Sequence, residues 1–245
     1  MVLRVLKIAS QLVIRSMCIE LFKMRVVGCR VLNLFQHLKY PLSIIAFLLV
    51  FSCKIKEKES SLPYYNTPDF TPFWTEKADK PHRIADFSFQ NQDGKTVTNA
   101  DFDGKIYIAN FFFTTCPSIC PKMQSNLTAV ATAFEHDDNV HIISHTVMPW
   151  IDTVGRLKEY ADLKNIDSKK WQLVTGSEGV IYDLARKSYF AEEAIGYTKD
   201  STQFLHTEHF LLVDGNRRLR GLYNGTLPLE VQRLIEDIKT LKKEK

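Results

Sequence analysis

The feature that most constrains the fold is one nearly uninterrupted apolar segment, Ile106-Tyr-Ile-Ala-Asn-Phe-Phe-Phe113. A strand that is apolar along its whole length, rather than at alternate positions, is typical of a strand buried on both faces of a sheet. Both faces of such a sheet have to be covered, and in α/β proteins helices cover them. The segment therefore predicts an α/β domain with this strand at its centre.

Strand and helix patterns alternate on either side of this segment. The pattern predicts, in order, a hairpin over 87–98 with Gly94 in its turn, the central strand, a helix over 121–135, a strand over 140–147, a helix from Asp152 through Leu163, a strand over 171–174, a helix after Ser177, a hairpin of 209–213 with 219–223, and a helix over 229–241. This order resembles that of thioredoxin-like proteins. It predicts one three-layer α/β sandwich with a central mixed sheet over about 82–245.

The N-terminal part of the chain has the features of an export signal. Residues 43–52 form an uncharged apolar run after a basic residue, and the run is much shorter than the ~20 residues that a membrane-spanning helix needs. Ser52-Cys53 ends the run and resembles a bacterial lipobox, which implies cleavage before Cys53 and its lipidation. We therefore expect a lipoprotein-type signal peptide over 1–52, for which Met17 and Met24 are alternative starts, and a lipid-anchored tether over 53–81. An uncleaved anchor with an incidental cysteine is the alternative.

The distribution of charge agrees with this division. Residues 1–52 contain seven Lys or Arg and one acid, so they carry +6 of a total net charge of +4, and the rest of the chain carries −2. A mildly acidic body lacks the basic surface that nucleic-acid binding requires. We therefore expect a membrane-anchored protein of the cell envelope that faces the extracytoplasmic side and does not bind nucleic acid.

Only two of the five cysteines, Cys116 and Cys120, lie in the exported body. They follow the central strand at its carboxyl end, where α/β proteins commonly place ligand sites, and they precede a helix whose N-terminal amides favour thiolate over thiol. Thiolates are soft ligands that select copper(I) or zinc, and two close cysteines can also form a disulfide. An inert disulfide that braces the loop is the structural alternative, although so short a loop would gain little from it.

A family resemblance rests on the cysteine loop. The run Thr115-Cys-Pro-Ser-Ile-Cys-Pro121 resembles the T-C-P-x-x-C-P signature of the Sco/SenC copper proteins, and 101–105 and 171–176 extend the similarity. The resemblance implies a thioredoxin-like fold, copper as Cu(I) or Cu(II), and a role in assembly of a membrane cytochrome c oxidase. It also implies that Cys116 and Cys120 are copper ligands.

The same resemblance implies a histidine as the third ligand, shortly before a late strand that ends in L-V-D. Counting back from Leu212-Val-Asp214 places His206 on this position, with His209 as the fallback. Met148 stands where the family has an acid and is a further candidate. The remaining strand histidines, His141 and His145, are expected to be structural.

Two functions follow. The first is a copper metallochaperone that delivers copper to the binuclear copper centre of cytochrome c oxidase, or to another copper-accepting protein. The second is an extracytoplasmic thiol–disulfide oxidoreductase, in which Cys116 and Cys120 are the catalytic redox pair that keeps partner cysteines reduced. No proline lies between Pro149 and Pro228, so the cis-proline of thioredoxin-like oxidoreductases is absent. Peroxide reduction is a weaker third reading, because no arginine lies near the cysteines in sequence.

Overall fold

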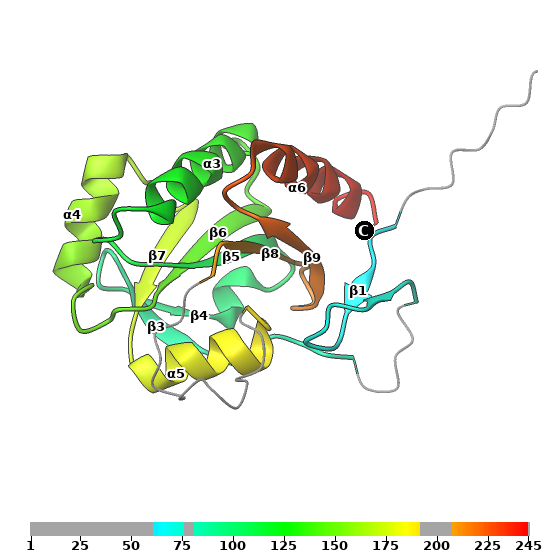
Figure 1. The fold of residues 1–245 in the computed structure, drawn as a ribbon, viewed down its shortest axis with the longest axis horizontal. Helices are drawn as coiled ribbons and strands as arrows, with labels where there is room; N and C mark the ends of the chain where they lie inside the picture. Colours follow the sequence, from blue (N-terminus) through cyan, green and yellow to red (C-terminus); the bar gives the residue numbers. More distant parts are fainter. Residues whose placement is uncertain (1–60, 76–80, 192–206, 245) are drawn as a thin grey trace, which may run out of the picture. The chain divides into compact units, whose positions relative to one another are not determined.

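A computed structural model describes residues 61–75, 81–191 and 207–244. These residues belong to one compact unit, Glu59–Lys245. Cys53 and His206 lie outside the described residues. Within the described part, a mixed sheet is packed between helices on both faces, so the predicted three-layer α/β architecture with a central mixed sheet is confirmed (Figure 1).

The sheet has nine strands in the order β2-β1-β9-β8-β5-β6-β7-β3-β4. Their bounds are β1 Tyr64–Tyr65, β2 Pro72–Phe73, β3 Ser88–Asn91, β4 Thr96–Thr98, β5 Ile106–Phe112, β6 Val140–Thr146, β7 Trp171–Thr175, β8 His209–Val213 and β9 Leu219–Asn224. β5, β6 and β7 are parallel, and the other pairings are antiparallel. Every residue of β5 is buried, as its apolar sequence predicts.

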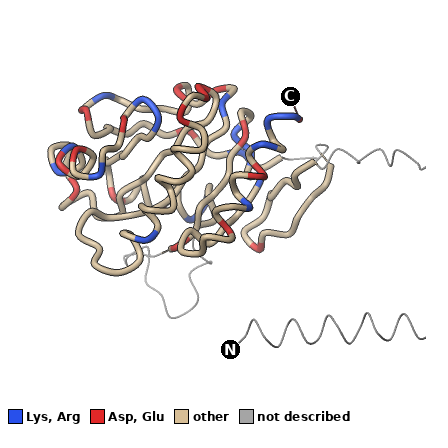
Figure 2. The backbone as a smooth tube through the Cα atoms, turned by 90° about the horizontal axis from the view of Figure 1, so that it is seen from above, with Lys and Arg blue, Asp and Glu red and all other residues tan. Residues whose placement is uncertain are grey.

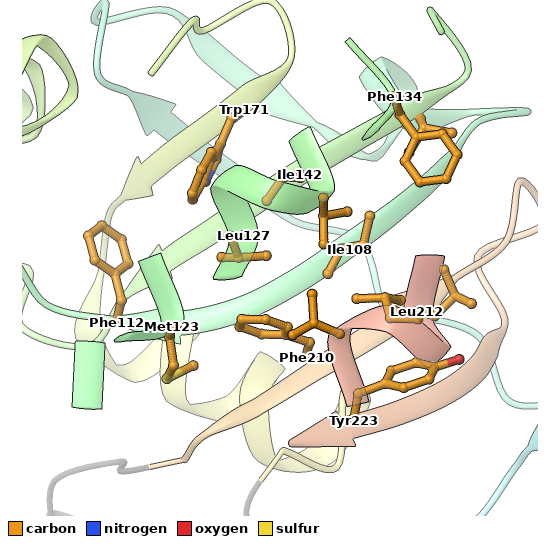
Figure 3. Close-up of a cluster of buried hydrophobic side chains, with 14 of the residues drawn as sticks. Ile108, Phe112, Met123, Leu127, Phe134, Ile142, Trp171, Phe210, Leu212 and Tyr223 are labelled. Atoms are coloured by element: carbon orange, nitrogen blue, oxygen red, sulfur yellow. The ribbon is translucent and has the colours of Figure 1, made fainter. Parts of the chain in front are cut away.

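The sheet divides the apolar interior into two clusters, and helices cover one cluster on each face. The helical elements are η2 Asn99–Phe102, α3 Ile119–Ala133, α4 Val154–Lys164, α5 Glu178–Asp183, the π-helical turn η3 Leu184–Ser188 and α6 Pro228–Leu241. Side chains of α3, α4 and α6 pack on one face, in the cluster that Figure 3 draws, and those of α5 and η3 pack on the other. Both cysteines belong to the first cluster.

Local sequence explains most of these boundaries. Gly94 has a φ of 73° in the β3–β4 turn, a conformation that glycine adopts without strain. Thr153 caps α4 by accepting a hydrogen bond from the Arg156 amide. Ser177 precedes α5 as expected, but its side chain makes no capping bond. α3 begins at Ile119, so Pro121 occupies the third helical position rather than the first, where its missing N–H still costs no helical hydrogen bond.

Residues 61–75, which the sequence pattern assigns to the tether, supply two short strands at one end of the sheet. β1 pairs with β9, and β2 pairs with β1. The buried Arg220 guanidinium holds this segment: it donates to the Leu62 and Pro63 carbonyl oxygens at 2.7 and 3.1 Å, and to the carboxylates of Asp214 and Glu244. We call these five residues the Arg220 clasp.

Candidate metal and thiol site

The two cysteines lie where the buried strand β5 gives way to α3. Cys116 is in the connecting loop, and its amide donates to the Phe113 carbonyl oxygen at 3.3 Å. Cys120 is in the first turn of α3. Both are free thiols, and their exposed fractions are only 8% and 7%. The loop therefore holds two unbridged sulfurs together in a largely apolar setting.

The surroundings make the two thiols chemically different. Burial raises the pKa of Cys116, but hydrogen bonds from the backbone amides of residues 118–120 and from the Cys120 thiol outweigh burial and hold that pKa below its usual range. Burial, with the negative charge of Cys116 and Asp152 as smaller causes, raises the pKa of Cys120 to about 12. Cys116 is therefore the sulfur that becomes thiolate first, while Cys120 keeps its proton.

The buried carboxylate of Asp152 accepts hydrogen bonds from the start of the cysteine loop. Asp152 is 0% exposed and accepts hydrogen bonds from the Thr114 amide at 3.1 Å and the Thr114 hydroxyl at 2.6 Å. It also accepts one from the Thr146 hydroxyl at 2.5 Å. Because Thr114, two residues ahead of Cys116 in the chain, follows β5 and Thr146 ends β6, Asp152 joins the carboxyl ends of two adjacent parallel strands.

A cleft of about 320 Å³ opens beside the two sulfurs. The cysteine loop forms one wall and α4 forms the other; the lining residues on α4 are Arg156, Glu159, Tyr160, Leu163 and Lys164. Burial, together with the nearby charges of Cys120, Asp152 and Cys116, raises the pKa of Tyr160 to about 12. The cleft gives a second molecule a route to the sulfurs along one face of α4.

Among the described residues, no three His, Cys, Asp or Glu side chains are grouped as a metal site. His209, the fallback ligand, begins β8; its ring Nδ1 lies 3.4 Å from the Ala191 carbonyl oxygen. Met148 packs with the cluster on the opposite face of the sheet from the cysteines. His206 stays a prediction, because it lies outside the described residues.

The two histidines of β6 have separate surroundings. The His141 ring Nε2 is 2.9 Å from the Asp138 carbonyl oxygen. His145 is fully buried among the rings of Phe87, Phe89, Phe111 and Tyr189, and neither of its ring nitrogens has a hydrogen-bond partner. Burial lowers its pKa to about 3, so His145 is neutral in the folded protein.

The sequence alone did not identify Asp152 or the α4 wall as parts of the site. Asp152 was interpreted as the start of a helix; it follows the end of β6 at Thr146 by six residues, and only the fold brings its carboxylate to the cysteine loop. No arginine lies near the cysteines in sequence, but the fold brings one there: Arg156 lines their cleft, and its Nε donates to the Thr114 hydroxyl at 3.3 Å. α4 brings it there from 40 residues further along the chain than Cys116.

Comparison with known proteins shows the family of this chain. A sequence profile of the SCO1/SenC family matches residues 75–243. The chain belongs to the SCO1/SenC family. Among solved Sco structures, BsSco, described as having a disulfide switch and as a member of the Sco family of cytochrome c oxidase assembly proteins, shares 31% identity at a TM-score of 0.57 and covers 67% of this chain and 96% of its own.

Two further Sco structures are similar. A SCO1/SenC family lipoprotein from Bacillus anthracis shares 29% identity at a TM-score of 0.57, over 66% of this chain and 95% of that chain. Copper-bound ScoI from Bradyrhizobium japonicum shares 26% identity at a TM-score of 0.51, over 63% and 98%. The fold of this chain is thus the thioredoxin-like fold of Sco proteins.

Proposed function

We propose that this Sco protein is a copper metallochaperone that delivers copper to the binuclear copper centre of a membrane cytochrome c oxidase, or to another copper-accepting protein. The observation that carries the proposal is the pair of free, enclosed thiols, Cys116 and Cys120, of which the first has a lowered pKa. Thiolate sulfur is the ligand that copper(I) prefers. The copper-bound Bradyrhizobium relative supports the same cargo.

His206 is the third ligand in this proposal. β8 begins at His209 and runs antiparallel to β5, with Ala109 opposite Leu211. The amino end of β8 is therefore at the same edge of the sheet as the loop that follows β5. An imidazole together with two thiolates would make a three-coordinate site suited to copper.

The second candidate function is thiol–disulfide exchange. It is favoured by the open cleft beside the sulfurs and by the unequal pKa values of the two thiols, because one low-pKa thiolate beside a protonated partner is the arrangement that disulfide exchange uses. The disulfide switch described for BsSco supports this alternative.

Location at the cell envelope follows from the proposed lipidation of Cys53, with residues 1–52 removed and 53–81 as the tether. The Bacillus anthracis relative is described as a lipoprotein. In the described part of the chain, no helix has the length and apolar character needed to span a bilayer. In Figure 2, basic and acidic residues are interspersed along the described backbone.

Copper stoichiometry tests the proposal. Reduced, anaerobic protein is loaded with copper(I), and bound metal is measured in wild type, Cys116→Ala, His206→Ala and His209→Ala. We expect one tightly held copper, lost in Cys116→Ala, weakened in His206→Ala and retained in His209→Ala. A wild type that holds no copper but exchanges disulfides rapidly would leave the oxidoreductase in its place.

A further inference from the structure

The α4 wall of the cleft carries three charged side chains, Arg156, Glu159 and Lys164, which line the approach to the cysteines. We propose that the cleft selects partners that bear a carboxylate beside the sulfur they present to Cys116 and Cys120. This inference rests on the proposed role of the cysteine pair in exchange with partner sulfur, and it names the chemical class of those partners.

Arg156 is the group that defines this selectivity. Its Nε donates to the Thr114 hydroxyl at 3.3 Å, and Thr114 is itself held by Asp152. The guanidinium is therefore tied to the residue two positions ahead of Cys116, while 47% of the side chain stays exposed. A guanidinium that one nitrogen fixes and that is partly exposed is suited to receive a carboxylate, because its other contact, the ion pair with Glu159, is long at 3.9 Å.

Lys164 adds a second positive charge two turns further along α4. It also lines the cleft, and its ammonium lies 5.9 Å from the centre of the Tyr160 ring. Glu159 is the one acid of the lining, but its side chain is 76% exposed and its carboxylate lies 3.9 Å from Arg156. Tyr160 and Leu163 supply an apolar surface between the two cations, so the wall matches a ligand with a short apolar part and an anionic end.

The exchange step balances without any further reactant. The Cys116 thiolate attacks one sulfur of a partner disulfide, a new S–S bond forms, and the other partner sulfur leaves as a thiolate. Cys120 then attacks the mixed disulfide, releases the second partner thiolate and gives its proton to solvent. The cysteine pair is oxidised to a disulfide by two electrons, and the partner disulfide is reduced to two thiols.

Charged disulfide probes test the selectivity directly. The full chain is purified in detergent with the cysteines of residues 1–60 replaced by serine, and reduced. It is then mixed with anionic dithiobis-nitrobenzoate, neutral dithiodipyridine or cationic cystamine in stopped flow. The rate with the neutral probe reports the reactivity of the cysteine pair itself. The ratio of anionic to neutral rate reports the charge of the wall, so a general disturbance of the loop cancels.

We expect Arg156→Gln to lower the anionic-to-neutral ratio about threefold, the size of effect that one partly exposed ion pair produces. The double variant Arg156→Gln with Lys164→Gln should lower this ratio about tenfold, and Glu159→Gln should raise it. Added salt should lower the ratio in wild type, because salt screens the charges of the wall. Lys158→Gln is the matched control: it removes a cation from the same helix, but Lys158 pairs with Asp93 and Asp162 and is not part of the lining.

Equal ratios in wild type and the double variant would overturn the proposal, as would a Lys158→Gln effect as large as that of Arg156→Gln. If wild type reacts with none of the probes, the proposal falls together with the oxidoreductase alternative, whereas copper binding is decided by its own assay.

Two acidic disulfides distinguish a small-molecule partner from a protein partner: glutathione disulfide represents the small molecule, and a peptide disulfide flanked by aspartates represents the protein. The faster of the two identifies the natural class, and its rate must fall in Arg156→Gln.

Discussion

The hydroxyl of Thr114 donates a 2.6 Å hydrogen bond to the buried carboxylate of Asp152, and so ties the chain two residues ahead of Cys116 to the segment that connects β6 with α4. The Thr114 amide donates to the same carboxylate at 3.1 Å. The position of the first sulfur therefore depends on a residue that does not touch it, 36 positions away in sequence.

Replacing Asp152 with alanine should destabilise the fold and loosen the cysteine loop. The change leaves the Thr114 and Thr146 hydroxyls without their acceptor, and a lost charged hydrogen bond costs about 1.5–3 kcal/mol. We expect the free energy of unfolding to fall by about 3 kcal/mol in urea denaturation and copper affinity to fall about tenfold. Asp162→Ala, on the exposed side of α4, is the control; an equal loss there would contradict the role of Asp152.

Alkylation should distinguish the two thiols. In Cys120→Ser only Cys116 remains in the site, and its lowered pKa predicts that the rate of iodoacetamide reaction reaches half its plateau below pH 9, the ordinary thiol value. In Cys116→Ser the remaining thiol, whose pKa burial raises to about 12, should react slowly across the same range. Mass spectrometry of timed samples measures both. Similar midpoints for the two variants would contradict the asymmetry.

Acid should destabilise the protein through His145. The unfolded imidazole takes up a proton below pH 6.5, whereas the folded one, with a pKa of about 3, does not. The unfolded state therefore binds more protons between these values, so stability falls as pH falls through this window and is constant above it. The loss should be about 2 kcal/mol at about pH 5.

Urea denaturation of His145→Phe should show a flatter dependence on pH between about 4 and 6.5, since phenylalanine fits the surrounding rings and does not titrate. His136→Gln is the matched control, because the His136 side chain is 92% exposed. A slope that persists unchanged in His145→Phe would assign the acid sensitivity to other groups.

The Arg220 clasp should contribute strongly to stability. Arg220→Met removes the partner of Asp214, which is itself buried, and the donor to the Leu62 carbonyl oxygen. Removing one partner of a buried ion pair costs about 3–5 kcal/mol. We expect that loss in urea denaturation, together with faster amide exchange in residues 61–65. Lys187→Met, which breaks an exposed pair with Asp183, should cost about 1 kcal/mol or less.

The sequence predicted the elements whose patterns are local. β5 was evident from its apolar run, the β3–β4 hairpin from Gly94, and the cysteine loop from its place between strand and helix. β1 and β2 were not predicted, because strands of two residues have no periodicity and depend on pairing with β9. The approach of α4 to the cysteines was missed for a related reason: it is a contact between distant segments that only tertiary packing creates.

The Arg220 clasp also has a mechanical consequence. One guanidinium bonds to the chain at Leu62 and Pro63 and to Glu244 near the other end, so both ends of the described domain meet at the same anchor point. A force applied to the chain ahead of Leu62 is taken up there first. β9 and β8 stand between that point and β5, so the load acts at the margin of the sheet, away from the strand that leads to the sulfurs. Tension on the chain that leads into the domain therefore acts first on Arg220 and its partners, and not on the cysteine loop.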